Sequence, residues 1–341
     1  MWLGPVAPRR GEHQFADSST WTTRRAGRKR DGIRSLFDRV STTRYRRWYR
    51  LCPAQILDFG NEVLAMIIDC HCHAGKGDGL TGPWDTDAPL GKYLLRAARA
   101  GINRSVLFAA FHSDYSIANR EVARIVHSRP DRFYGFAFVN AGRDRGRVRP
   151  MIDEAVTRYG FVGIKIHRHD SPITREVCES ARAFSLPVIY DVVGEVSVVQ
   201  LLAEEYPDVS FIIPHLGSFA DDWRAQLALI DHLVRHPNIF ADTSGVRRFD
   251  LLEQAVQRAG AKKILFGTDG PWLHPAVELA KVKVLNLSPA DEALVLSGNF
   301  LRLIARVGTR RQPRVDESLN DWNAGALAVT VDRGDPWQAN L

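Results

Sequence analysis

Residues 66–73 of this 341-residue chain read Met-Ile-Ile-Asp-Cys-His-Cys-His, a short apolar run that ends in two histidines separated by one residue. Alternate side chains of a β-strand point to the same face, so His71 and His73 would project together. Two imidazoles on one face at a strand end can bind one metal ion. The stretch therefore predicts a first strand that leads into a metal site; the alternative is that both histidines are structural strand residues.

Similar runs of β-branched and aromatic residues recur along the chain, and amphipathic stretches of helical length separate them. Eight such repeats in about 240 residues fit a (β/α)8 barrel better than an open doubly wound sheet. No GxGxxG follows the first strand, which counts against a dinucleotide-binding fold. We therefore expect an α/β chain folded as a (β/α)8 TIM barrel. The expected strands cover residues 66–71, 103–109, 133–139, 161–167, 187–193, 209–214, 238–243 and 263–268, and the expected helices include 90–100, 119–127, 175–184, 196–205, 223–235 and 250–259.

Metal-binding and titratable side chains gather where these strands end, which is where a barrel of this kind builds its active site. Five of the eleven histidines lie at the ends of the first, fourth and sixth strands. Lys165 and His167, two residues apart, share a face of the fourth strand. The strand-end set comprises His71, His73, Lys165, His167, His169, Asp191, His215, Asp242 and Asp269.

The net charge of +7 belongs to residues 1–65, which carry thirteen Lys and Arg against six Asp and Glu. Residues 66–341 are therefore neutral overall, and the basic balance does not indicate a nucleic-acid-binding barrel. The basic segment has little apolar periodicity, so we expect a largely disordered extension over 1–65, followed by the barrel over 66–308 and a short C-terminal appendage over 309–341. No apolar stretch follows the paired arginines, which argues against a secretory signal; an organelle transit peptide is the alternative.

The four cysteines show no CxxC or zinc-knuckle spacing. A domain of this size does not need disulfides, so a reducing cytoplasm is the expected compartment. No apolar run approaches the roughly 18 to 20 residues of a membrane helix, and we expect no membrane partner. The expected partners are a small-molecule substrate and, since barrels often dimerise, a second copy of the chain.

The motifs at the strand ends resemble those of the amidohydrolase-related (amidohydrolase 2) family of the metal-dependent hydrolase superfamily, which includes aminocarboxymuconate semialdehyde decarboxylase-like proteins. The resemblance covers roughly residues 66–307 and is specific for the family, but not for a substrate. It rests on Asp69-x-His71-x-His73, Gly163 to His167, Pro214-His215-Leu216-Gly217, Asp242-Thr243-Ser244-Gly245, Leu265-Phe266-Gly267-Thr268-Asp269, and the closing stretch from Leu287 to Phe300.

The resemblance implies that His71 and His73 are metal ligands and that zinc is the usual ion. It implies that Asp269 is a ligand or general base and His215 a catalytic acid/base or second ligand. The sequence departs from the family at the end of the fifth strand, where these proteins often carry a histidine and this chain has Asp191. Either Asp191 binds the ion there, since a carboxylate can also bind zinc, or His167 takes the vacant place.

Such a site activates a bound water, and it supports two reactions. A metal held by imidazoles and one carboxylate lowers the pKa of its water toward about 7. Asp269 and His215 could then move protons during hydrolysis of a small organic molecule, which is our main expectation. The alternative is non-oxidative decarboxylation of a small carboxylic acid, which needs a cation such as Lys165 or Arg168 facing the metal. An inactive barrel that serves as a binding protein is an alternative of another class.

Further residues are expected to contact substrate because they lie at the fourth or fifth strand end or in loops that reach the pocket. Lys165 is expected as a pocket cation rather than a carboxylated metal bridge. The substrate-binding candidates are Lys165, Asp191, His112, Trp272 and His274.

Overall fold

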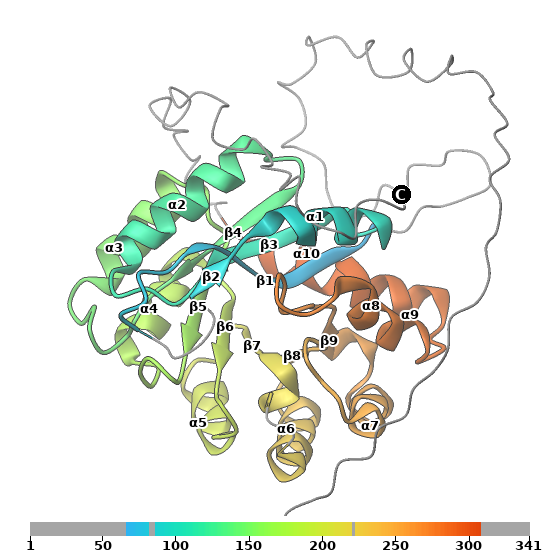
Figure 1. Cartoon of the computed structure of the whole chain (residues 1–341). Coiled ribbons are helices and arrows are strands. Elements are labelled where there is room, and N and C mark those ends of the chain that lie inside the picture. The colour runs from blue at the N-terminus through green and yellow to red at the C-terminus, as the bar shows by residue number, and fades with distance from the viewer. Residues whose placement is uncertain (1–65, 82–85, 220–221, 308–341) are drawn as a thin grey trace, which may run out of the picture. The chain divides into compact units, whose positions relative to one another are not determined.

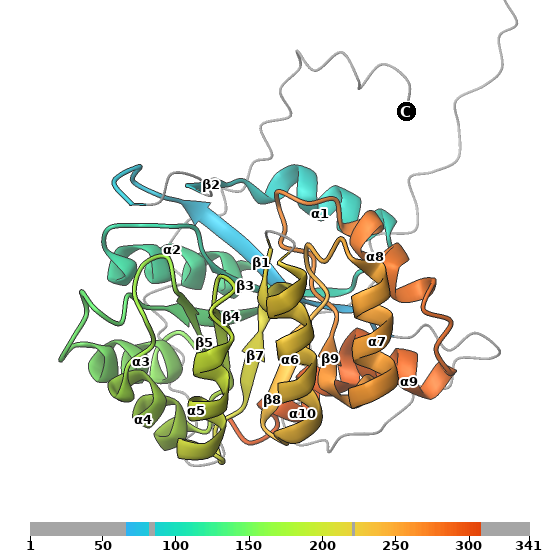
Figure 2. The same cartoon turned by 90° about the horizontal axis from the view of Figure 1, so that it is seen from below.

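The computed structural model describes residues 66–81, 86–219 and 222–307; the extensions expected over 1–65 and 309–341 lie outside these residues. Within the described residues, eight parallel strands neighbour one another in the order in which they occur in the sequence, with helices packed along them (Figures 1 and 2). A two-residue strand, β2, pairs antiparallel with β1. The expectation of a (β/α)8 TIM barrel is confirmed.

The eight barrel strands occur where the runs of β-branched and aromatic residues predict them. Seven of them are shorter than the expected run, and β1 begins two residues later and ends five residues later than expected. The strands are β1 (Ile68–Lys76), β2 (Asp87–Ala88), β3 (Arg104–Ala109), β4 (Phe133–Phe138), β5 (Gly163–His167), β6 (Val188–Asp191), β7 (Phe211–Ile213), β8 (Ile239–Asp242) and β9 (Ile264–Leu265).

All six expected helices are present. Two further helices, Val148–Thr157 and Pro275–Lys283, were not among those expected. Pro150 stands at the third position of α3, within an arginine-rich segment that obscures its apolar face. The helices are α1 (Leu90–Arg99), α2 (Tyr115–Ser128), α3 (Val148–Thr157), α4 (Arg175–Phe184), α5 (Ser197–Glu205), α6 (Trp223–Arg235), α7 (Phe249–Ala259), α8 (Pro275–Lys283), α9 (Pro289–Ala293) and α10 (Asn299–Ile304). No helix in the described part of the chain is both long and apolar enough to cross a membrane.

The ring between β9 and β1 is closed by backbone hydrogen bonds that mostly involve residues beyond the two-residue β9. The N–H of Cys70 donates to the carbonyl of Phe266 at 2.9 Å, and the N–H of Asp269 donates to the carbonyl of His71 at 2.8 Å. The N–H of His73 donates to the carbonyl of Gly270 at 2.7 Å. Closure therefore places the segment that ends in Asp269 directly beside the two histidines.

β1 contains one extra residue relative to β3. Asp69 pairs with Ser105, whereas Cys72 pairs with Leu107, so three steps on β1 match two on β3. A bulge of this kind re-aims the side chains that follow it. It explains why Cys70 lies in the apolar interior of the barrel although His71 and His73 also face inward.

The interior of the barrel is packed with apolar side chains at the N-terminal ends of the strands. Phe300 of α10 is 2% exposed and packs into this interior cluster. Its ring lies 5.1 Å from that of Tyr134 and 6.3 Å from that of Phe136. The helix α10 thus supplies a floor to the barrel, and the strand-end histidines and carboxylates lie at the opposite end.

Candidate metal centre

His71, His73 and Asp269 form a compact group of buried ligand atoms, all within 4.8 Å of one another. The Oδ1 atom of Asp269 lies 3.4 Å from Nε2 of His71 and 3.7 Å from Nε2 of His73. The Nε2 atom of His71 is buried and has no hydrogen-bond partner among the described residues. A buried nitrogen without a partner, beside a second imidazole and a carboxylate, fits a divalent metal ion.

The Nδ1 atoms of both histidines are held by oxygen acceptors. Nδ1 of His71 donates to Oδ2 of Asp242 at 2.7 Å, and Nδ1 of His73 donates to the carbonyl of Ala109 at 2.8 Å. A proton on Nδ1 leaves the lone pair on Nε2, which is the arrangement usual for metal-binding histidines. Burial, followed by the charge of Lys165, lowers the pKa of His71 and holds that of His73 well below its usual value. Both imidazoles are therefore neutral at pH 7 and able to bind a cation.

Asp69 ties β1 to the segment that carries Asp269. Its carboxylate accepts the backbone N–H groups of His71 at 3.0 Å and of Thr268 at 2.9 Å. It also accepts the hydroxyls of Thr268, at 2.6 Å, and of Tyr93. Burial outweighs these hydrogen bonds and raises the pKa of Asp69 to about 7. The backbone of Asp269 is left-handed, with φ of 56°, and this turn directs its side chain toward the histidines.

His215 lies beside this group, and its ring centroid is 5.0 Å from that of His71. The backbone of His215 is left-handed, with φ of 57°. Its Nδ1 donates to the carbonyl of Ser244 at 2.8 Å, and its backbone N–H donates to Asp242 at 3.1 Å. Burial alone would lower the pKa of His215, but hydrogen bonding to Asp191 and that residue's charge, with smaller effects of Asp269 and Asp242, raise it to about 9.

His167 and Asp191 lie outside the group of three ligand atoms. The Oδ2 atom of Asp191 is 3.2 Å from Nε2 of His167 and 3.3 Å from Nε2 of His215. Burial would raise the pKa of Asp191, but His167 and then His215 hold it well below its usual value. Asp191 is therefore an anion that links the ends of β5 and β7 rather than an exposed pocket residue.

The two cations considered from the sequence have different surroundings. Lys165 is fully buried inside the barrel, with Nζ 4.9 Å from the centre of the Phe108 ring, and its charge acts on both His71 and His73. Arg168 instead forms a two-pronged ion pair with Glu195, with nitrogen to oxygen distances of 2.7 to 2.9 Å. Only Lys165 of these two lies inside the barrel near the histidines.

The three loop candidates differ in position. The ring of Trp272 lies 4.7 Å from that of His73, and its Nε1 donates to the carbonyl of Asp87 at 3.0 Å. His112 accepts the backbone N–H of Asp114 at 2.8 Å, two residues along its own loop. His274 is exposed and caps the start of α8. His112 also lies 3.6 Å from the carboxylate of Asp78, in the loop after β1. The structure thus brings Trp272 to the centre, whereas His112 and His274 contact residues of the loops around it.

Sequence reasoning assigned no role to Asp242, Ser244 or Tyr93. Asp242 accepts four hydrogen bonds, from His71, from the backbone of His215, and from the backbone and hydroxyl of Ser244. The signal for Asp242 was its place at the end of β8. No pattern pointed to Tyr93, which lies on α1 and reaches Asp69 only through the folding of the barrel.

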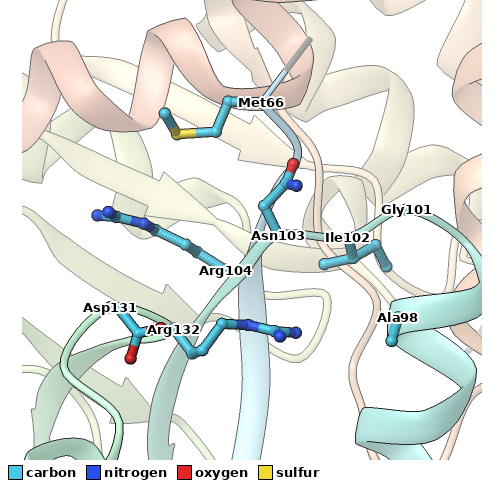
Figure 3. A pocket seen from close by; sticks show the side chains of 8 residues that line it. All are labelled: Met66, Ala98, Gly101, Ile102, Asn103, Arg104, Asp131 and Arg132. Carbon is cyan, nitrogen blue, oxygen red and sulfur yellow. The ribbon is translucent and has the colours of Figure 1, made fainter. Parts of the chain in front are cut away.

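A surface hollow of about 500 Å³ lies at the N-terminal ends of β1, β3 and β4 (Figure 3). Met66, Asn103, Arg104 and Arg132 are among its lining residues. None of the predicted site residues lines it, so the strand-end chemistry and this hollow lie at different ends of the barrel.

The family model described as amidohydrolase matches residues 68–305, more than two thirds of the chain. The chain belongs to the amidohydrolase family. This membership and the His71, His73 and Asp269 group together support a divalent metal centre in an enzyme of the metal-dependent amidohydrolase superfamily. No curated protein matches the chain.

Solved structures similar to this amidohydrolase include enzymes of two reaction types. The 5-carboxyvanillate decarboxylase from Sphingomonas paucimobilis is 15% identical, with a TM-score of 0.56 over 71% of this chain and 100% of that one. A dihydroxybenzoic acid decarboxylase from Polaromonas, with bound manganese and 2-nitroresorcinol, is 18% identical, with a TM-score of 0.53 over 70% and 97%. The 4-oxalomesaconate hydratase from Rhodopseudomonas palustris is 18% identical, with a TM-score of 0.55 over 71% and 96%. At these identities the likeness establishes the fold.

Proposed function

We propose that this amidohydrolase is a metal-dependent, non-oxidative decarboxylase of a small carboxylic acid. The observation that carries the proposal is the buried Lys165, whose ammonium group lies inside the barrel and acts electrostatically on both predicted metal-binding histidines. Two of the solved structures with this fold are decarboxylases of aromatic acids, and these relatives favour decarboxylation over the hydrolysis expected from the sequence.

A buried cation in the pocket favours an anionic substrate. A lysine ammonium in low dielectric interacts strongly with a carboxylate that enters beside it. His71, His73 and Asp269 would hold the divalent ion, which when bound acts as a Lewis acid toward an oxygen of the substrate. Lys165 would bind the substrate carboxylate and so orient the substrate toward the His71, His73 and Asp269 group.

Decarboxylation also needs a proton at the carbon that loses carbon dioxide. The bond between that carbon and its carboxylate breaks, the electron pair left on the carbon takes up a proton, and carbon dioxide leaves. His215 is the candidate donor, because its pKa is raised to about 9 and it is protonated at pH 7. Asp191 and the carbonyl of Ser244 hold its ring in place.

Hydrolysis is the second candidate function, and the position of Asp269 favours it. The Asp269 carboxylate lies beside both Nε2 atoms, where it could accept a proton from a water molecule activated in the centre. His215 would then protonate the leaving group. Hydrolysis does not require the substrate to be an anion, so it gives Lys165 no direct role.

The test is a substrate screen of the full chain after loading with Zn²⁺ or Mn²⁺. Aromatic and enoic carboxylic acids would be assayed for carbon dioxide release, and esters, lactones and amides for cleavage. We expect carbon dioxide release from a carboxylic acid, with loss of at least about 100-fold in kcat/KM in Lys165→Met, whose unbranched side chain is one atom shorter and carries no charge. Arg168→Met, on the neighbouring loop, is the matched control and should retain activity.

Two results would reject the proposal. Cleavage of esters, lactones or amides without any carbon dioxide release would favour hydrolysis. A folded chain that binds neither ion and transforms no compound would favour the inactive barrel expected as a third possibility from the sequence.

A further inference from the structure

We propose that the metal ion is held by three protein ligands only, His71, His73 and Asp269, and that Asp191 is a positioning residue for His167 and His215. The inference rests on the metal centre of the proposed function and concerns the position where the family often carries a histidine. It means that neither Asp191 nor His167 fills the place of that histidine in the coordination sphere.

Both carboxylate oxygens of Asp191 are already used within the protein. Oδ1 accepts the backbone N–H of Val193 at 2.9 Å. Oδ2 lies 3.2 Å from Nε2 of His167 and 3.3 Å from Nε2 of His215. Asp191 is 6% exposed, so water cannot readily replace these partners if the carboxylate turns away.

The hydrogen-bond pattern around His167 and His215 places protons on their Nε2 atoms. Nδ1 of His167 accepts the backbone N–H of His169 at 3.1 Å, so the proton on this ring is on Nε2. Nδ1 of His215 donates to the carbonyl of Ser244, and its Nε2 lies 3.3 Å from Oδ2 of Asp191, an oxygen that can only accept, so this contact also needs a proton on Nε2. Both Nε2 groups therefore donate to Asp191, and neither presents a lone pair to an ion.

The backbone after β6 holds the Asp191 carboxylate in this position. Val193 has a left-handed φ of 50°, which is rare for a β-branched residue. Its N–H reaches back to Oδ1 of Asp191, and the next N–H, of Gly194, donates to the carbonyl of Gly217 at 2.9 Å. The turn is thus tethered at both ends, and moving Asp191 toward the ion would disrupt it.

Asp269 differs from Asp191 in the respect that matters for a ligand. Among the described residues, no hydroxyl or backbone N–H donates a hydrogen bond to its carboxylate, and one oxygen faces the Nε2 atoms of His71 and His73. A carboxylate with available lone pairs beside two imidazoles can bind a cation without breaking hydrogen bonds. The Asp269 carboxylate is therefore suited to bind the ion, and the Asp191 carboxylate to hold His167 and His215.

The first measurement is calorimetric titration of the full chain with Zn²⁺ and with Mn²⁺, without any substrate. We expect Kd to change by less than about fivefold in Asp191→Ala, and to rise by more than about 100-fold in Asp269→Ala. Glu195→Ala, which removes an acid from the neighbouring loop outside the histidine group, is the matched control. A loss of affinity in Asp191→Ala comparable to that in Asp269→Ala would overturn the three-ligand set.

The second measurement follows the imidazoles themselves by long-range ¹H–¹⁵N NMR of histidine-labelled protein. In the wild type we expect Nε2-bound protons on His167 and His215 that exchange slowly with solvent, and faster exchange of both in Asp191→Ala but not in Glu195→Ala. Asp191→Asn, which keeps one acceptor oxygen, should restore part of the protection and covers the case in which Asp191→Ala does not fold. Unchanged exchange in both Asp191 variants would overturn the positioning role.

The two measurements separate the inference from the proposed function. A wild-type chain that binds neither ion would reject the metal centre and the ligand set together, while the NMR signals would still decide the role of Asp191. A chain that binds an ion but releases no carbon dioxide would reject decarboxylation and leave the ligand set standing.

Discussion

The carboxylate of Asp242 controls which nitrogen of His71 is available to a metal ion, and Asp242→Asn tests this control. Oδ1 of Asp242 accepts three hydrogen bonds, from the backbone of His215 and from the backbone and hydroxyl of Ser244, at 2.5 to 3.1 Å. Oδ2 accepts the Nδ1 proton of His71 at 2.7 Å. An asparagine that preserves the three bonds at Oδ1 must turn its NH₂ group toward His71.

His71 must then change its tautomer. An NH₂ group cannot accept the Nδ1 proton, so Nδ1 becomes the acceptor and the proton moves to Nε2, the atom that faces Asp269. Nε2 can no longer bind a cation. We expect Kd for Zn²⁺ and Mn²⁺ to rise by about 100-fold, which corresponds to about 2.7 kcal/mol.

Asp242→Asn should also lower the free energy of unfolding, by no more than it weakens metal binding. This loss of stability should depend on pH. Burial alone would raise the pKa of Asp242, but the charge and hydrogen bond of His71, with His215 and Ser244, lower it to about 2 from 3.8. A lowered pKa stabilises the folded state above pH 4, by about 2.5 kcal/mol, and this contribution is lost as the pH falls through 2. The variant should lack this acid-sensitive contribution.

The assay is calorimetric titration of the metal, combined with ¹⁵N NMR of the His71 tautomer in metal-free protein. Ser244→Ala is the control, because it removes a hydrogen bond to Asp242 and a hydroxyl 3.3 Å from Nδ1 of His71, but keeps the carboxylate oxygen that accepts the Nδ1 proton. If Asp242→Asn binds either ion within threefold of the wild-type affinity, or if His71 keeps its proton on Nδ1, the reasoning is refuted.

Two further predictions concern the opposite end of the barrel. Phe300→Ala should lower the free energy of unfolding by about 3 to 5 kcal/mol in urea titrations, because it empties the floor of the barrel, whereas Val277→Ala on an exposed position of α8 should change it by less than about 0.5 kcal/mol. Burial lowers the pKa of Lys263 to about 8 from 10.5, so between these pH values the unfolded chain holds a proton that the folded chain has lost, and stability should rise with pH. Urea titrations at pH 8 and pH 10 should show a smaller rise in Lys263→Met than in the wild type, and an equal rise would show that Lys263 is not its source.

Much of the fold could be predicted from the sequence because barrel strands carry a strong local signal. Runs such as 161–167 and 238–243 combine β-branched residues with a polar strand end, and neighbouring strands in sequence are neighbours in the sheet. The helix α3 was not predicted, because Pro150 and the arginines around it mask its apolar pattern. The bulge in β1 was not predicted either. The sequence was read with strict alternation, which places Asp69 on the same face as His71 and leaves no extra residue between them.

The site was only partly accessible from sequence, for a different physical reason. His71 and His73 are two residues apart, so their common face follows from local geometry. The approach of Asp269 depends on the closure of the barrel, and the pairing of Asp191 with both His167 and His215 depends on side-chain distances across three strand ends. Sequence alone therefore left Asp191 and His167 as equal candidates for one vacant place.

The floor formed around Phe300 has a consequence for molecular traffic through the barrel. Among the described residues, apolar side chains fill the ring at its N-terminal end, so a small molecule would reach the centre built around His71 from the C-terminal ends of the strands. Whatever enters must leave by the same route, so a second substrate molecule cannot push product out through a rear exit. Under the proposed function, the organic product must therefore leave before the next substrate enters, and it should compete with substrate for the site.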